Sequence, residues 1–341
     1  MTGDQQKALV TTGLYEGWVR GDWAKVEEEF YGPDMLVHIP EQAQALDREG
    51  WRGMRGMLLE GFPDFGMRVI DIVAEGDRVA LRWEMSGTHN GRFAGFPATG
   101  KRFLVEEFVI VRIADGKVAE FWLGPDRLEH FRQLGLITDT PPPRALLVAL
   151  RAVSRLTALV PRRAGAGRRP GISTTHTPPA EYRTTGGPDG PPARRAIEEL
   201  WSGSEAEAVT DLYAPGVVVH HPDAPAPVEG REAALSLHAE RRRAFSGYRV
   251  TVEDIVGEAG LVIARCRASG THSGDLDSMP ATGRPFSIEK FAMFRIVDGA
   301  VEEVWMLSDR MSLMQQLGLA PEGPPPRPLI ALMRLRDRGR S

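Results

Sequence analysis

The chain has 341 residues, of which 42% are apolar and 26% charged, and its formal net charge is -4. This is the composition of a folded protein long enough for more than one domain, and the small negative charge argues against a nucleic-acid binder. No apolar run approaches the roughly 18 residues of a membrane span. The single cysteine, Cys266, has no partner for an internal disulfide, and the polar N-terminus lacks a secretory pattern, so we expect a cytoplasmic protein.

In chain order, the first half predicts helices followed by an antiparallel meander. Apolar residues at helical intervals predict a helix over Lys7 to Tyr31, then a short strand at 35–40 and a helical segment over Gly50 to Glu60. A last helix begins near Asp126 and ends at Gly135, a plausible C-cap. Between these helices, alternating apolar positions separated by turn signals predict four strands, at 68–74, 78–88, 101–113 and 117–123. The order predicts an α+β fold with helices on one face of a curved sheet.

The sequence repeats itself at a shift of about 183 residues. The segment SGTH at 86–89 recurs at 269–272, and RIADGKVAEFW at 112–122 returns as RIVDGAVEEVW at 295–305. DRLEHFRQLGL, from 126, returns as DRMSLMQQLGL, from 309. Solenoid repeats are much shorter, so this period indicates a duplicated domain.

Two domains and a linker follow from the repeat. We expect a first domain over 1–160 and a second over 193–341, each ending in a basic helix. The segment 161–192 has almost no large apolar side chain and is predicted to be a disordered linker. The basic segments, 144–163 and 327–340, have apolar residues at helical spacing between arginines. We favour packing of these helices on the folded domain over binding to an anionic membrane surface.

The motifs, taken in order and twice, resemble a known family. GTHxGxxxGxPATGK starts at Gly87, RxxDGKVxExW starts at Arg112, and an aspartate and then QLG follow. In this order they resemble the SnoaL-like polyketide cyclases of the NTF2-like superfamily, over nearly all of each unit and outside the linker. The resemblance implies two tandem cone-shaped α+β barrels, each with an apolar pocket. It also implies cofactor-independent ring closure of an aromatic polyketide by intramolecular aldol condensation.

Two aspartates are the candidate catalytic groups. Asp126 and Asp309 match the residue that the resemblance identifies as the general acid/base of the cyclases. A carboxyl in an apolar cavity is able to take a proton next to a carbonyl and return it to the new alcohol. The alternative is purely structural, because each aspartate precedes a helix and is able to cap it.

Histidines are further candidates. His89 and His272 lie in the GTH turn, where an imidazole is able to donate to a developing enolate. His38 and His220 close the first strand of each unit and are candidate substrate contacts. All four are alternatively turn or rim histidines bonded to the backbone.

The remaining candidates lie on strands. Trp122 and Trp305 are predicted to line a pocket or to belong to the core, and Phe121 and Val304 stand where the cyclases usually have histidine. Three further residues in the first unit are candidate substrate contacts if their strand faces point inward, and surface residues if they point outward: Arg82, Glu106 and Phe108. Inward, Arg82 and Glu106 are expected to pair at the cavity wall.

The leading hypothesis is a cofactor-independent cyclase or isomerase acting on a polyketide-like, hydrophobic carbonyl compound. The alternatives are an epoxide hydrolase or epoxide-opening cyclase, as found among superfamily relatives, and a non-catalytic ligand-binding module. No cluster has metal-ligand spacing, so we expect no metal and no cofactor. We expect an intramolecular pseudo-dimer, with a further homo-oligomer left open. The first half, which keeps the fuller family-like stretches GFPDF at 61–65 and FAGFPATGK at 93–101, is expected to be the more active.

Limited proteolysis tests the domain boundaries. We expect the first cuts between Pro161 and Pro192, because this segment has too few apolar side chains to bury. Mass spectrometry of the fragments would locate the cuts. First cuts inside either predicted domain would contradict this division of the chain.

Overall fold

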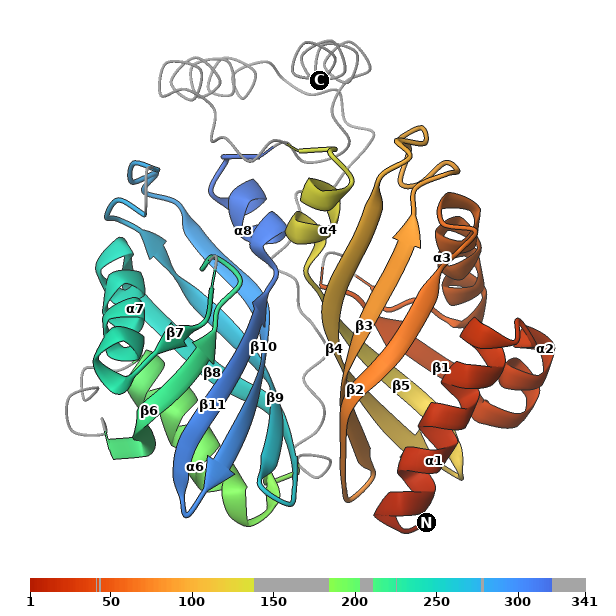
Figure 1. The fold of residues 1–341 in the computed structure, drawn as a ribbon, viewed down its shortest axis with the longest axis horizontal. Coiled ribbons are helices and arrows are strands. Elements are labelled where there is room, and N and C mark those ends of the chain that lie inside the picture. Colours follow the sequence, from red (N-terminus) through yellow and green to blue (C-terminus); the bar gives the residue numbers. More distant parts are fainter. Residues whose placement is uncertain are drawn as a thin grey trace.

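The computed structural model describes residues 1–40, 42, 44–137, 184–202, 211–224, 226–276 and 279–320. They form two α+β units that stand side by side, each a curved sheet with helices on its outer side, such as α1 (Gly3–Leu14) and α3 (Arg48–Gly61) in the first unit and α7 (Arg231–Ala244) in the second (Figure 1). This confirms the predicted fold class. Two further helices, α4 (Arg127–Gln133) and α8 (Arg310–Gln316), lie next to each other between the units. Both predicted basic helices, 144–163 and 327–340, lie outside the described residues.

The first unit follows the predicted order of elements. Its helical segments are α1 (Gly3–Leu14), η1 (Tyr15–Val19), α2 (Trp23–Lys25), η2 (Val26–Phe30), α3 (Arg48–Gly61) and α4 (Arg127–Gln133). Its strands are β1 (Tyr31–His38), β2 (Gly66–Glu75), β3 (Arg78–Thr88), β4 (Arg102–Ala114) and β5 (Lys117–Pro125). The sheet order is β1-β5-β4-β3-β2, in which only the pair of β1 and β5 is parallel.

The second unit repeats this arrangement. Its helical segments are η4 (Gly187–Asp189), α6 (Gly190–Arg195), η5 (Ala196–Trp201), α7 (Arg231–Ala244) and α8 (Arg310–Gln316). Its strands are β6 (Tyr213–His220), β7 (Val228–Glu229), β8 (Phe245–Glu258), β9 (Leu261–His272), β10 (Pro285–Val297) and β11 (Ala300–Ser308). The sheet order, β7-β6-β11-β10-β9-β8, matches that of the first unit with β7 added at one edge.

Two boundaries differ from the sequence-based expectation. The helix predicted over Lys7 to Tyr31 is interrupted at Gly21, whose φ of 73° lies in the left-handed region that glycine tolerates. The predicted linker ends earlier than expected, because residues 184–192 contain η4 and the start of α6. The carboxylate of Glu75 accepts hydrogen bonds from the backbone of Thr185 and Gly186, which ties this segment to the first unit.

The two units pack sheet against sheet with approximate two-fold symmetry. The apolar part of the contact contains Phe108 stacked on its counterpart Phe291, with ring centroids 6.4 Å apart. Arg82 lies 4.6 Å from the ring centroid of Trp305, and Arg265 lies 5.4 Å from that of Trp122. Each tryptophan therefore makes a cation–π contact with an arginine of the other unit.

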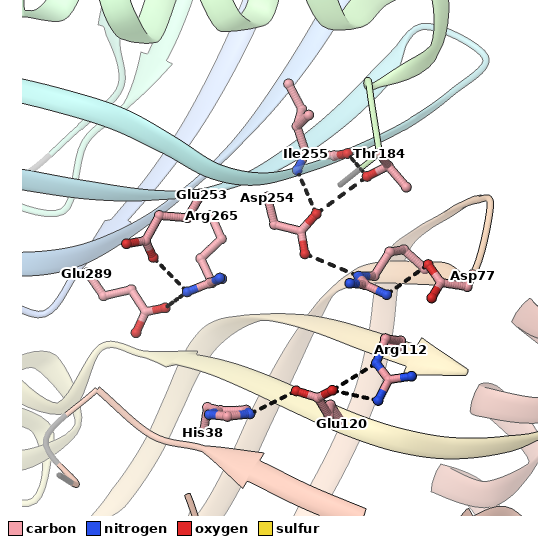
Figure 2. A network of polar contacts seen from close by, with 11 residues as sticks. His38, Asp77, Arg112, Glu120, Thr184, Glu253, Asp254, Ile255, Arg265 and Glu289 are labelled. Carbon is pink, nitrogen blue, oxygen red and sulfur yellow. Dashed lines mark hydrogen bonds and ion pairs between the residues drawn. The ribbon is translucent and has the colours of Figure 1, made fainter. Parts of the chain in front are cut away.

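Carboxylates cross the same contact in equivalent pairs. Glu75 accepts a hydrogen bond from the backbone of Gly257, and Glu258 accepts one from the backbone of Ala74. Beside them, Arg78 donates to Asp254 at 3.2 Å, and both side chains are fully buried. Figure 2 shows Asp254 with Thr184 and Ile255, and shows Arg265 between Glu253 and Glu289. Charge on this face of each sheet is thus matched.

We expect Arg78→Met to destabilise the full chain by about 3–5 kcal/mol, because it leaves the buried carboxylate of Asp254 without its cation. Equilibrium urea unfolding measures the change. Arg68→Met is the matched control, since Arg68 pairs with Glu84 on the exposed surface and its loss costs at most about 1 kcal/mol. Equal, small effects of both substitutions would show that the buried pair does not stabilise the contact.

Candidate active site

A buried carboxyl lies between the sheet and the helices of the first unit. Along β4, Val109 and Val111 pack toward the helices, and Phe108 and Ile110 pack toward the second unit. Glu107 shares the helix-facing side, and only 4% of its surface is exposed. The indole Nε1 of Trp83, its cross-strand neighbour on β3, donates a hydrogen bond to its carboxylate at 2.8 Å.

Burial raises the pKa of Glu107 to about 7, and the hydrogen bond from Trp83 opposes this only in part. A second carboxyl, Glu289, has its pKa raised to about 7 by burial, but it faces the other unit and pairs with Arg265. A carboxyl with such a pKa is able both to accept and to return a proton near neutral pH.

Several aromatic side chains belong to the same apolar cluster as Trp83, the hydrogen-bond partner of Glu107. Trp18 contacts Trp23 and Phe65, with ring centroids 4.9 Å and 4.7 Å apart, and belongs with Trp83 to one apolar cluster. Trp51 donates to the hydroxyl of Tyr31 at 3.3 Å. Burial raises the pKa of Tyr31 to about 12, so this phenol stays neutral. The helix-facing side of the sheet, on which Glu107 lies, is therefore apolar and rich in aromatic rings, which suits a flat hydrophobic compound.

Two histidines lie in a second aromatic cluster of the same unit. His89 is fully buried, its Nδ1 lies 3.0 Å from the hydroxyl of Thr99, and its ring lies against Phe62. His130, on α4, lies 4.2 Å from Phe103 by ring centroids. Burial, with a smaller contribution from His89, lowers the pKa of His130 to about 4. Among the described residues neither Nε2 atom has a hydrogen-bond partner, so both imidazoles keep one free polar atom.

The second copy of the GTH turn is similar. His272 is fully buried, and its Nδ1 lies 3.2 Å from the hydroxyl of Thr282. Its ring packs against Phe245. The GTH histidines are thus core residues beside the β3–β4 hairpin and its counterpart, the β9–β10 hairpin, and their catalytic role stays a prediction.

Asp126 and Asp309 cap helices at the contact between the units. Asp126 accepts a hydrogen bond from the backbone of Glu129 at 3.1 Å, and Asp309 accepts one from the backbone of Ser312 at 3.0 Å. Each also pairs with an arginine of the other unit: Asp126 with Arg310 at 2.6 Å, and Asp309 with Arg127 at 3.2 Å. Burial raises the pKa of Asp126, although Arg310 opposes it. Their role as general acid/base stays a prediction.

The tryptophan and histidine candidates also face the contact between units. Trp122 is fully buried there, and the ring of His38 stacks on it at 5.0 Å. His38 also bonds to Glu120 at 3.1 Å, and Figure 2 shows Glu120 between His38 and Arg112. In the second unit, His220 stacks on Trp305 at 4.9 Å and bonds to Glu303 at 2.8 Å.

The expected pair of Arg82 and Glu106 forms, at 3.2 Å, but on the sheet face that meets the second unit. Arg82 also pairs with Asp71 at 2.7 Å. Phe108 packs on Phe291 in the same contact. These residues share a face, as the alternation predicted, but it is not the face beside Glu107 and the helices. Their assignment to substrate binding stays a prediction.

Sequence reasoning missed Glu107. The signal was present in the pair Glu106–Glu107, because strand alternation places one of two adjacent carboxyls on each face. The repeat gave a second signal, since Lys290 occupies the equivalent position while Glu106 has its equivalent in Glu289.

No helix among the described residues is long and apolar enough to cross a membrane. The same residues contain no group of three or more His, Cys, Asp or Glu side chains arranged to hold a metal ion.

Comparison with known proteins agrees with the fold. A family model described as SnoaL-like polyketide cyclase matches residues 8–134 and 192–317. Aklanonic acid methyl ester cyclase DnrD from Streptomyces peucetius is 32% identical over 33% of this chain and 77% of its own length. DauD, a cyclase of the same name from Streptomyces sp. (strain C5), is 35% identical over 33% of this chain and 69% of its own length.

A solved structure similar to part of this chain is that of IdmH, a putative polyketide cyclase from Streptomyces antibioticus. It is 35% identical over 38% of this chain and 97% of that chain, with a TM-score of 0.35. Because the family model matches most of both folded units, the chain belongs to the SnoaL-like polyketide cyclase family.

Proposed function

We propose that the chain is a cofactor-independent cyclase that closes a ring of a polyketide-like carbonyl compound by intramolecular aldol condensation. The first unit is the reacting one in this proposal. The observation that carries it is Glu107, a buried carboxyl of raised pKa among aromatic side chains. The curated relatives are named as cyclases of aklanonic acid methyl ester, and this compound is our proposed substrate class.

The chemistry requires one group to move one proton twice. Ionised Glu107 takes a proton from the carbon next to a carbonyl, and the resulting enolate carbon attacks a second carbonyl carbon in the same molecule. This forms the ring bond and leaves an alkoxide, which takes the proton back from Glu107. The indole N–H of Trp83 holds the carboxylate in place during both transfers.

The original candidate, Asp126, is the alternative acid/base. Its two carboxylate oxygens are engaged, one by the helix backbone and one by Arg310, which favours a structural role. Asp309 is also engaged by its helix backbone and by an arginine, since Ser312 and Arg127 both donate to its Oδ1. We therefore assign the proton transfer to Glu107 and retain Asp126 as the alternative that the experiment tests.

Glu107→Gln is expected to lower kcat/KM for aklanonic acid methyl ester by about 100-fold or more, because an amide does not take the proton. Chromatographic detection of the cyclised product measures the rate, and circular dichroism checks the fold. Glu84→Gln is the control, since Glu84 follows Trp83 on the same strand and pairs with Arg68 at the exposed surface. Its rate should stay at the wild-type value.

The aspartates complete the comparison. Asp126→Asn is expected to keep most activity and to lose about 1 kcal/mol or more of stability with its helix cap and ion pair, and Asp309→Asn is expected to behave alike. A full rate in Glu107→Gln with a 100-fold loss in Asp126→Asn would return the acid/base role to Asp126. Loss in neither variant would contradict the proposed mechanism.

The raised pKa of Glu107 also predicts how stability depends on pH. At pH values between 4.5, the ordinary pKa of glutamate, and about 7, Glu107 keeps its proton in the folded chain and loses it in the unfolded chain. Rising pH therefore destabilises the fold in this range. Across this pH range the free energy of unfolding of the wild type should fall by about 3 kcal/mol relative to that of Glu107→Gln, because the glutamine side chain does not ionise. Urea unfolding of both proteins at pH 5 and pH 8 measures the difference. A difference that is the same at both pH values would refute the raised pKa.

A further inference from the structure

Lys290 occupies, in the second unit, the position that Glu107 has in the first. Glu107 pairs across the sheet with Trp83 of β3, and Lys290 pairs with Cys266 of β9. The neighbours of Lys290 on β10, Glu289 and Phe291, face the first unit. The lysine side chain therefore faces the helices of its own unit.

This lysine is buried without a counter-ion. Only 8% of its surface is exposed, and in the part of the chain that the structure describes its ammonium group makes no hydrogen bond or ion pair. Its Nζ lies 5.5 Å from the ring centroid of Trp201. A cation–π contact offsets only part of the cost of removing an ammonium group from water, so the environment favours an added anion.

The surrounding polar groups do not supply that anion. Burial, with a smaller contribution from Lys290, lowers the pKa of His238 well below its usual value. Burial, with a smaller contribution from Arg241, lowers the pKa of His221 to about 3, so both imidazoles are neutral. His238 lies 2.9 Å from the hydroxyl of Tyr213.

Nearby carboxylates already have partners. Asp223 pairs with Arg241 and Arg310, and Glu198 accepts a hydrogen bond from the backbone of Val252. The carboxylates next to Lys290 along and across the sheet, Glu253 and Glu289, pair with Arg265 on the opposite face. None of these four carboxylates pairs with Lys290.

We propose that the second unit binds an aromatic carboxylate, with Lys290 as the counter-ion of the carboxylate group. The apolar cluster around Lys290 includes Trp201 and Phe294, whose rings stack with centroids 5.6 Å apart, and provides contacts for a flat ring system. The interiors of the two units thus carry different ionisable groups. The first has the carboxyl of Glu107, and the second has the ammonium group of Lys290, which selects an anionic ligand. This site is independent of ring closure in the first unit.

Isothermal titration calorimetry of the full chain with 2-naphthoate tests the site, and methyl 2-naphthoate is the uncharged comparison. Wild type should bind 2-naphthoate at least 10-fold more tightly than the ester, because only the acid carries the charge that Lys290 pairs. Lys290→Met should remove this preference. Lys290→Gln is a second variant, of similar length and polar, in case the methionine variant does not fold.

Two further variants locate the binding. Lys101→Met removes an exposed lysine of the first unit and should leave the affinity for 2-naphthoate unchanged. Glu107→Gln should also leave it unchanged, whatever its effect on ring closure, so the two proposals fail separately. Absence of 2-naphthoate binding, equal affinity for acid and ester, or an unchanged preference in a folded Lys290 variant would each overturn the proposal.

Discussion

Both faces of each central sheet are covered, and the rest of the structure depends on this constraint. Helices cover one face, and the other unit covers the second face (Figure 1). A strand in this position has no solvent-facing side on which to carry unpaired charge. Arginines such as Arg78 and Arg265 are therefore held by carboxylates and tryptophan rings, and the contact between units is polar as well as apolar.

The same constraint explains which parts of the structure could be predicted from sequence. Element order, the repeat and the hairpin around His89 follow from local periodicity and turn residues, which act over short distances. Arg82 and Glu106 do pair, but at the contact between the units and not at the cavity wall for which the pair was expected. Strand alternation does not indicate which face of the sheet meets the helices, because both faces are buried in this protein. For this reason the candidate substrate contacts Trp122 and Phe108 lie at the contact between the units. For the same reason Glu107, which follows Glu106 and faces the helices, was overlooked.

Several contacts between the units occur in both copies of the duplication. Phe108 and Phe291, Glu75 and Glu258, and the two capping aspartates occupy equivalent positions and make equivalent contacts. In the interior, the carboxyl of Glu107 is replaced by the ammonium group of Lys290. A contact between two copies restricts both partners, whereas each interior is restricted only by its own ligand and its own packing.

The double engagement of Asp126 and Asp309 has a consequence for unfolding. Each carboxylate accepts a hydrogen bond from the backbone in the first turn of its helix, and each also pairs with an arginine of the other unit. Separating the units would therefore weaken the starts of α4 and α8, and fraying of either helix would release one of the ion pairs between the units. Local opening of these helices and separation of the two units are therefore coupled.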